Sequence, residues 1–167
     1  MLAILDLNTG IVVADVQGNL LSEEEFARMS VALCAEYQDP KAGIEDNDWG
    51  IAVIRAMQDL GYTNFYERKT IDGKDSGNIG WHTDEKSRYA LFGDLIPAIN
   101  GSLITMYAED AIADFQAVVR NPLKNGRIEA AAGLHDDYPI AVGIAWMLRT
   151  EVYTYSTETE IHRFATS

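Results

Sequence analysis

The chain has 167 residues, of which 47% are hydrophobic and 23% charged, which is enough apolar material for the core of one domain. It has no apolar run of ~18 residues and no basic N-terminal region, so the sequence predicts neither a transmembrane helix nor a signal peptide. Its single cysteine, Cys34, excludes an internal disulfide, and we expect a cytoplasmic protein without membrane contact.

The formal net charge of −13 argues against a self-sufficient DNA-binding module, because contacts with phosphates need lysine and arginine. Two arrangements would reconcile an acidic chain with DNA. Clustered carboxylates can hold divalent ions, which reverse the local potential, and a neighbouring domain can supply most of the affinity for DNA. The charge alone leaves both arrangements open.

The first half of the chain predicts a hairpin, a helix, a short strand, a second helix and a further strand. These elements are expected at residues 2–17, 23–37, 42–45, 53–60 and 63–68. The hairpin turn is Asn8-Thr9-Gly10, between two β-branched-rich stretches. The first helix has a capping-box pattern, in which Ser22 is followed three residues later by Glu25.

The second half predicts a mobile glycine-rich loop at 70–82, a helix capped by Thr83, a strand, a helix, a loop and a last helix. The strand is expected at 102–107, the helix at 111–120, the second loop at 121–133 and the last helix from about residue 136. The loop at 121–133 has a possible short hairpin around Asn125-Gly126. Residues 150–167 form a polar tail. This order predicts one α/β domain over residues 1–167, with a mixed sheet flanked by helices.

Two acidic features stand out in this arrangement. Glu45 ends a strand that reads as buried, and the carboxyl ends of strands in α/β sheets commonly face the ligand crevice. Asp136 and Asp137 start an apolar helix, where a capping acid and a first-turn acid explain both residues without catalysis. Glu45 can likewise be an ordinary turn acid. Together, however, such carboxylates suit Mg²⁺, although spacing alone leaves open whether Glu45 and Asp136 meet.

Four motifs, in this order, carry a resemblance to a known family. They are the hairpin 3–14, the strand and Asn-containing turn 43–50, the helix entry Ile79-Gly80-Trp81-His82-Thr83 with Lys86, and the stretches 126–130 and 133–137. The last, Gly133-Leu134-His135-Asp136-Asp137, is the most specific. In these motifs the chain resembles the C-terminal nuclease domain of tailed-phage large terminases, in the ribonuclease H-like superfamily.

The resemblance implies a ribonuclease H-like fold and a metal-dependent endonuclease that hydrolyses DNA phosphodiesters during DNA packaging, with Mg²⁺ or Mn²⁺ as cofactor. It implies that Glu45 is the second metal-binding acid, Asp136 the terminal one and Asp137 an additional ligand. The implied partners are double-stranded DNA, an ATPase domain, the small terminase subunit and the portal protein, in the cytoplasm of a bacterial host. His135 either orients a carboxylate, contacts phosphate or only packs at the turn.

The chain departs from the family pattern at its start. The family's first catalytic Asp lies on a strand before the hairpin, whereas this sequence begins at the hairpin, and neither Asp6 nor Asp15 matches the missing position. We therefore expect a fold without its first strand, and weak metal binding and DNA cleavage by this chain alone. No Walker-type phosphate loop occurs in it. A non-catalytic phage assembly module on a decayed nuclease fold is the alternative, and the net charge and the missing acid favour it.

Basic residues gather around the two glycine-containing loops and are the candidate phosphate contacts. The candidates are Arg68, Lys69, Lys74, Lys86, Arg88 and Arg127. The alternative for each is a solvated surface charge. His82 and His162 lack the spaced partners of a zinc site, so no zinc site is expected.

Overall fold

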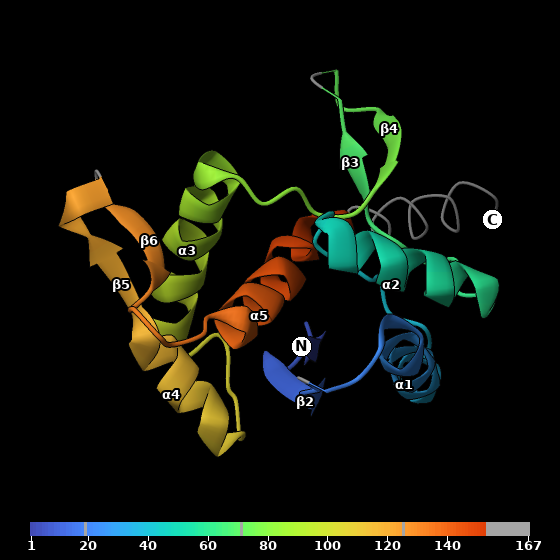
Figure 1. Ribbon diagram of the computed structural model, residues 1–167, viewed down its shortest axis with the longest axis horizontal. Coiled ribbons are helices and arrows are strands. Elements are labelled where there is room, and N and C mark those ends of the chain that lie inside the picture. The colour runs from blue at the N-terminus through green and yellow to red at the C-terminus, as the bar shows by residue number, and fades with distance from the viewer. Residues whose placement is uncertain (19, 71, 125, 153–167) are drawn as a thin grey trace, which may run out of the picture.

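The computed structural model in Figure 1 describes residues 1–18, 20–70, 72–124 and 126–152. Its helices are α1 (Glu23–Glu36), α2 (Asp48–Asp59), α3 (Glu85–Asn100), α4 (Glu109–Ala117) and α5 (Asp137–Met147), with a 3₁₀ turn at Pro122–Lys124. Its strands are β1 (Leu2–Asp6), β2 (Ile11–Val16), β3 (Glu67–Lys69), β4 (Asp75–Ile79), β5 (Val118–Asn121) and β6 (Arg127–Ala130). Most of the predicted polar tail, with His162, lies outside the described residues.

Helix α5 occupies the centre of the fold, between α3 and α4 on one side and α1 and α2 on the other (Figure 1). It packs against β1, α3 and α4. Six of its eleven residues are buried, at positions around most of the helix, namely Tyr138, Pro139, Ile140, Val142, Gly143 and Ile144. A helix that is apolar all round is stable only when it is surrounded, so the other elements are arranged around α5.

Strand β1 separates the two apolar clusters of the core. Ile4 belongs to the cluster formed with the inner faces of α1 and α2, whereas Ala3 and Leu5 pack against the cluster built around α3 and α5. Successive side chains of a strand point to opposite faces, which explains this division. The predicted hairpin is confirmed: β1 and β2 pair antiparallel with a register shift between Ile4 and Leu5.

The strands form three antiparallel pairs, β1–β2, β3–β4 and β5–β6. Isolated parallel bridges join further extended segments to one another or to a strand: Ile11 with Thr105, Ala42 with Phe65, and Glu45 with Trp81. Antiparallel and parallel pairing therefore both occur, as expected of a mixed sheet. The strand predicted at 42–45 is an extended segment held by two of these bridges.

Residues 70–82 differ from the expected mobile loop, because most of them belong to the β3–β4 hairpin. The Lys69 ammonium lies 2.6 Å from the Asp75 carboxylate across the two strands. The backbone N–H of Thr70 donates to the Lys74 carbonyl at 2.7 Å and closes the turn. The glycine at position 73 has a φ of +76°, which a non-glycine residue rarely adopts.

Two helix starts show how local chemistry sets the boundaries. The predicted capping box of α1 is present, with Ser22 and Glu25 bonding to each other's backbone N–H groups. Helix α3 begins one residue later than expected, because Asp84 accepts from the Ser87 N–H and is the cap in place of Thr83. No helix in the described ranges is long and apolar enough to cross a membrane.

The packing of α5 on α3 gives a matched pair of glycine substitutions. A Cβ on Gly143 of α5 would lie 2.3 Å from Cδ2 of the buried Leu91, whereas a Cβ on Gly93 of α3 meets nothing within 4 Å. We expect Gly93→Ala to raise the free energy of unfolding by about 0.5–1 kcal/mol through helix propensity. Gly143→Ala should instead lower it, since overpacking a core costs about 1–3 kcal/mol. Urea denaturation of both variants measures the difference, and equal stabilisation would contradict the packing described.

Candidate active site

A cavity of about 780 Å³ lies between β1, residues 40–45, α1 and α5. Residues 1–8 line it without a break, and so do residues 40–45. Further lining residues come from α1, including Phe26 and Ser30, from α2, including Val53, and from α5, including Ile140 and Ile144. Its volume is within the range of ~300–1,000 Å³ that is typical of ligand pockets.

Two of the three predicted acids, Glu45 and Asp137, line this cavity. Glu45 is half-buried, and its Oε1 accepts a hydrogen bond of 2.5 Å from the hydroxyl of Thr83. Asp137 is the first residue of α5 and its side chain is 67% exposed. The structure therefore brings together one fixed and one solvent-accessible carboxylate from segments 92 positions apart in the sequence (137 minus 45).

The amino group of Met1 lies at the same place. Burial lowers the pKa of this amino group below its ordinary value, and the negative charges of Asp137 and Glu45 partly oppose the shift. Both carboxylates thus act on one cationic group.

Asp136 has a different environment from Asp137. Its Oδ2 forms an ion pair with the Arg88 guanidinium and accepts the backbone N–H of Ala130 at 3.0 Å. It occupies the N-cap position of α5 but makes no side-chain capping bond, and it does not line the cavity. With an exposure of 20%, its carboxylate joins α3, β6 and the start of α5. Glu45 and Asp137 line the cavity, whereas Asp136 does not.

Sequence reasoning missed the partners of these acids. Asp46, next to Glu45, is 17% exposed and lies 3.0 Å from both the Arg68 guanidinium and Nδ1 of His82. Consecutive strand residues face opposite directions, which accounts for the different partners of Glu45 and Asp46. The only sequence feature that could have separated the environments of Glu45 and Asp46 is the alternation of side-chain direction at the end of a strand.

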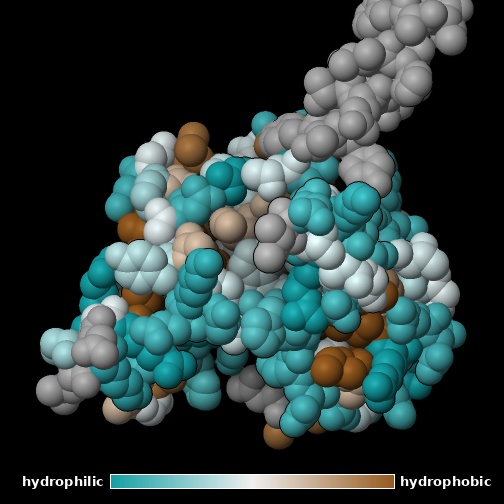
Figure 2. Space-filling model, turned by 90° about the horizontal axis from the view of Figure 1, so that it is seen from above, coloured by the Kyte–Doolittle hydropathy of each residue, from teal (hydrophilic) through white to brown (hydrophobic). Residues whose placement is uncertain are grey.

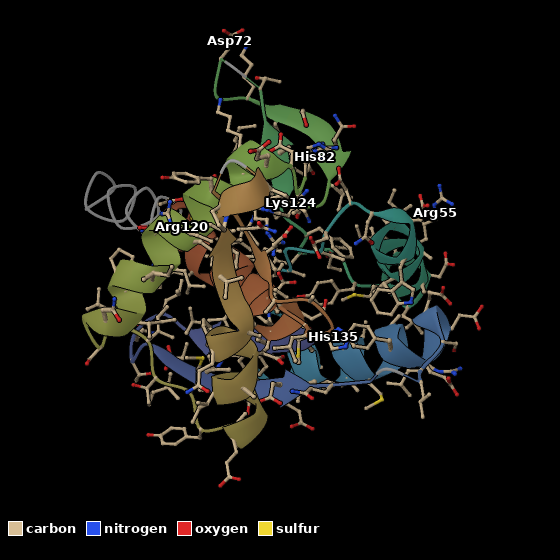
Figure 3. The ribbon with its side chains drawn as sticks, turned by 60° about the vertical axis from the view of Figure 1, so that its left-hand side comes forward. Arg55, Asp72, His82, Arg120, Lys124 and His135 are labelled. Atoms are coloured by element: carbon tan, nitrogen blue, oxygen red, sulfur yellow. The ribbon has the colours of Figure 1, made fainter. Side chains whose placement is uncertain are left out.

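The two histidines in the described ranges lie apart in Figure 3, His82 before α3 and His135 before α5. His135 is 75% exposed, with its Nδ1 3.9 Å from Asp137 Oδ2. Within the part of the chain that the structure describes, no group of three or more histidine, cysteine, aspartate or glutamate side chains is placed to hold a metal ion. The acids that line the cavity are Asp6, Glu36, Glu45 and Asp137, and the last two, which are predicted metal ligands, are called the acid pair.

Most of the predicted phosphate contacts are engaged with acids. Arg68 pairs with Asp46, Lys69 with Asp75 and Glu151, Arg88 with Asp136, and Arg127 with Glu129 at 3.6 Å. Lys74 and Lys86 are exposed. The face seen in Figure 2 is mostly hydrophilic, with hydrophobic residues in separate patches.

Comparison with known proteins identifies the fold. No protein-family model matches the chain, and no curated protein matches its sequence. Among solved structures, the large terminase nuclease from the thermophilic phage G20c superposes with a TM-score of 0.62 over 87% of this chain and 72% of that one. The chain has the fold of a large terminase nuclease. The two sequences are 16% identical, so the similarity establishes the fold and confirms the predicted ribonuclease H-like class.

The neighbouring acids Asp136 and Asp137 should respond differently to substitution. Asp136→Ala leaves the largely buried Arg88 guanidinium without its carboxylate, and we expect a loss of about 2–4 kcal/mol in the free energy of unfolding. Asp137→Ala removes a mostly exposed side chain and should change it by less than ~0.5 kcal/mol. Chemical denaturation compares the two, and equal effects would refute the separate roles.

The Met1 amino group predicts a pH-dependent contribution to stability. Its pKa is lowered in the folded chain, so the unfolded chain binds more protons between that pKa and about 8. Stability should therefore rise with pH through this window. Thermal melts of the free and Nα-acetylated chains should show that acetylation removes the rise. A difference between the two chains that stays constant from pH 6 to 9 would exclude the effect.

Proposed function

We propose that this chain is the nuclease module of a phage DNA-packaging terminase, with Glu45 and Asp137 as its metal-binding carboxylates. The observation that carries the proposal is the placement of both acids at one cavity in a terminase nuclease fold. Both acids also belong to the motifs in which the sequence resembles that family. The proposed reaction is hydrolysis of DNA phosphodiesters.

The two carboxylates suit Mg²⁺ or Mn²⁺. Mg²⁺ in phosphate-processing sites commonly uses one or two carboxylates, with waters and phosphate oxygens as the remaining ligands. Thr83 holds Glu45 in one orientation, and Asp137 is open to solvent. A bound ion would neutralise charge on the phosphate and lower the pKa of a coordinated water. In this proposal Asp136 positions the start of α5, rather than acting as the terminal ligand.

DNA binding by the isolated chain is proposed to be weak. Each phosphate contact needs a cation, and a net charge of −13 repels DNA at long range. Arg88 is 13% exposed and committed to Asp136, so it suits a structural role better than a phosphate contact. Exposed lysines such as Lys74 and Lys86 remain candidates. An ATPase domain and other packaging proteins are the proposed source of further DNA affinity.

A non-catalytic assembly module on the same fold is the second candidate. The strongly acidic composition favours it, as does the finding that no group of three or more potential metal ligands is clustered among the described residues. Such a module would keep the fold and lose the affinity for divalent ions. Direct measurement of metal binding therefore separates the two functions.

Isothermal titration with Mn²⁺ tests the proposed site. We expect Glu45→Gln and Asp137→Asn each to weaken Mn²⁺ binding about tenfold or more, since each removes a charged ligand. The matched control is Asp59→Asn, at an exposed position at the end of α2, which should leave the affinity unchanged. Mn²⁺ affinity that survives both cavity substitutions would show that the ion binds elsewhere, and absence of affinity in the unsubstituted chain would favour the assembly module.

A plasmid-nicking assay in Mn²⁺ tests the reaction itself. We expect slow cleavage that Glu45→Ala abolishes and Asp59→Asn does not affect. Robust cleavage by the 167-residue chain, again lost in Glu45→Ala, would overturn the expectation that the isolated chain is a poor nuclease.

A further inference from the structure

A second cavity, of about 170 Å³, lies between the first turns of α3 and the β5–β6 hairpin. This volume can hold one phosphate group with a few ordered waters, at ~30 Å³ per water. Its lining is separate from that of the larger cavity and includes Glu85, Arg88, Tyr89, Arg120, Arg127 and Ile128. Because three of these residues are arginines, we call it the arginine pocket.

Positive charge exceeds negative charge around the arginine pocket, in contrast to the chain as a whole. Residues 84–89 and 118–130, with Asp136, carry five basic and four acidic side chains, a net charge of +1. The other 8 basic and 22 acidic residues give −14. Exposed charges are screened beyond ~10 Å in 0.1 M salt, so an anion at this pocket is affected mainly by the local charges.

Arg88 forms a wall of the pocket and links it to the start of α5. Its Nε donates to the Ile128 carbonyl at 2.5 Å, and its guanidinium pairs with Asp136. The residue after Asp136 is Asp137, a member of the acid pair. Consecutive Cα atoms are ~3.8 Å apart, so one arginine and one aspartate connect the pocket to the proposed metal site.

Arg120 has a charge that no acid among the described residues neutralises. Its guanidinium carbon lies over the Tyr89 ring, 5.4 Å from the ring centroid. No ion pair in the described ranges includes Arg120. The N–H donors of a guanidinium lie in its plane, so a ring against its face leaves them available to a ligand.

The backbone of β6 adds a further donor. The Ile128 carbonyl accepts from Arg88, and the Ala130 N–H donates to Asp136, so both groups point to the edge of β6 that faces away from β5. The N–H and the carbonyl of one residue in an antiparallel strand point to the same edge. The Ile128 N–H therefore faces the arginine pocket as well.

Arg127 is held less firmly than Arg88. Its Nε lies 3.6 Å from Glu129 Oε2, beyond the ~2.7–3.2 Å of a hydrogen bond. Lys124 is the closer partner of Glu129, at 2.8 Å, and this bond lowers the pKa of the Glu129 carboxyl. The Arg127 side chain is 51% exposed, so it can turn to a ligand without losing a hydrogen bond to Glu129.

We propose that the arginine pocket binds one phosphate group of the DNA backbone, with Arg120, Arg127 and the Ile128 N–H as donors. This inference rests on the proposed function, because the pocket then holds a second phosphate of the DNA that is cut at the acid pair. Arginine side chains and backbone N–H groups commonly donate to DNA phosphates, and such contacts position the duplex without reading its sequence.

Two lysines favour a DNA strand over a free phosphate ion as the occupant. Lys86 lies in the first turn of α3, and Lys124 lies in the turn between β5 and β6. Both are exposed. A polymer of phosphates can contact these lysines and the pocket together, whereas a single phosphate cannot.

A fluorescein-labelled duplex of about twenty base pairs is the probe for the full 167-residue chain, with fluorescence anisotropy as the readout. The measurement is made in EDTA at low salt, so it needs neither metal nor cleavage. We expect saturable binding with a Kd on the order of 1–100 µM, as is usual for sequence-independent contacts. Absence of binding at millimolar protein would overturn the proposal.

Arg120→Gln removes the charge that the pocket offers to a phosphate. We expect it to weaken duplex binding about fivefold and to reduce the slope of log K against log salt by about 0.9, the value for one phosphate contact. Arg55→Gln, at an exposed position of α2, is the matched control and should change neither quantity. An unchanged slope in Arg120→Gln, or an equal loss in both variants, would refute the site.

Glu85→Gln should have the opposite effect. The Glu85 carboxylate lines the pocket and repels an anion there, whereas its place in the first turn of α3 is favourable for the helix dipole. We therefore expect Glu85→Gln to tighten duplex binding about threefold, which a general disturbance of the fold would not do. Circular dichroism melts establish folding, and unchanged or weaker binding by folded Glu85→Gln would contradict the proposal.

A deoxynucleoside monophosphate distinguishes the two sources of a phosphate group. It contacts the pocket alone, so it should displace the duplex only at millimolar concentration. Displacement at or below the concentration of duplex phosphates would identify a free nucleotide as the occupant and overturn the assignment to DNA.

Plasmid nicking separates failure of this inference from failure of the proposed nuclease. If both hold, Arg120→Gln raises the KM for plasmid about fivefold and leaves kcat unchanged. Nicking that depends on Glu45 but has the same KM in Arg120→Gln would refute the arginine pocket alone. Duplex binding that depends on Arg120, in a chain without Mn²⁺ affinity at the acid pair, would refute the nuclease and retain the phosphate site.

Discussion

Burial of helix α5 around most of its circumference is the constraint on which the rest of the structure depends. Its apolar residues have no polar face to present to water, so strands and helices must close around it. Gly43 shows how closely they approach, since a Cβ at that position would lie 2.6 Å from Cγ2 of Ile144. The close approach of the 42–45 segment carries Glu45 into the same cavity as Asp137, at the first turn of α5. The position of the acid pair thus follows from packing around one helix.

Local chemistry made part of this fold predictable. The turn at Asn8-Thr9-Gly10 and the capping box of Ser22 and Glu25 act within a few residues, and both appear as expected. The β3–β4 hairpin was missed because β4 is mostly exposed and lacks the apolar alternation that identifies a strand. Its stability depends on ion pairs and turn bonds, which a hydrophobic pattern does not report. The bridges of residues 42–46 to 64–66 and to 81 join segments that the sequence separates.

The candidate site was predictable in its residue types but not in its geometry. Adjacent residues at a helix start are rotated by about 100° around the axis, so Asp136 and Asp137 cannot share one environment. Which acid faces the cavity depends on Arg88, 48 residues away along the chain. Nothing in a single sequence pairs Arg88 with Asp136 rather than with phosphate. The sequence likewise does not show the role of Thr83. Asp84 caps α3 in its place, and the Thr83 hydroxyl donates a hydrogen bond to Glu45 instead.

The acid pair lies in a cavity of the size of a ligand pocket, which has an electrostatic consequence. A substrate that fills this cavity would displace water from around Glu45 and Asp137, and desolvated carboxylates cost free energy unless a cation balances them. A cation bound there in turn gains from the lower dielectric around it. Each ligand therefore favours the other, and thermodynamic linkage requires the gain in affinity to be equal in both directions. With the cavity open to water, the same two carboxylates remain solvated and, under the proposed function, would hold a divalent ion weakly. The low activity expected of the isolated chain then follows from hydration of its acid pair as well as from the number of its ligands.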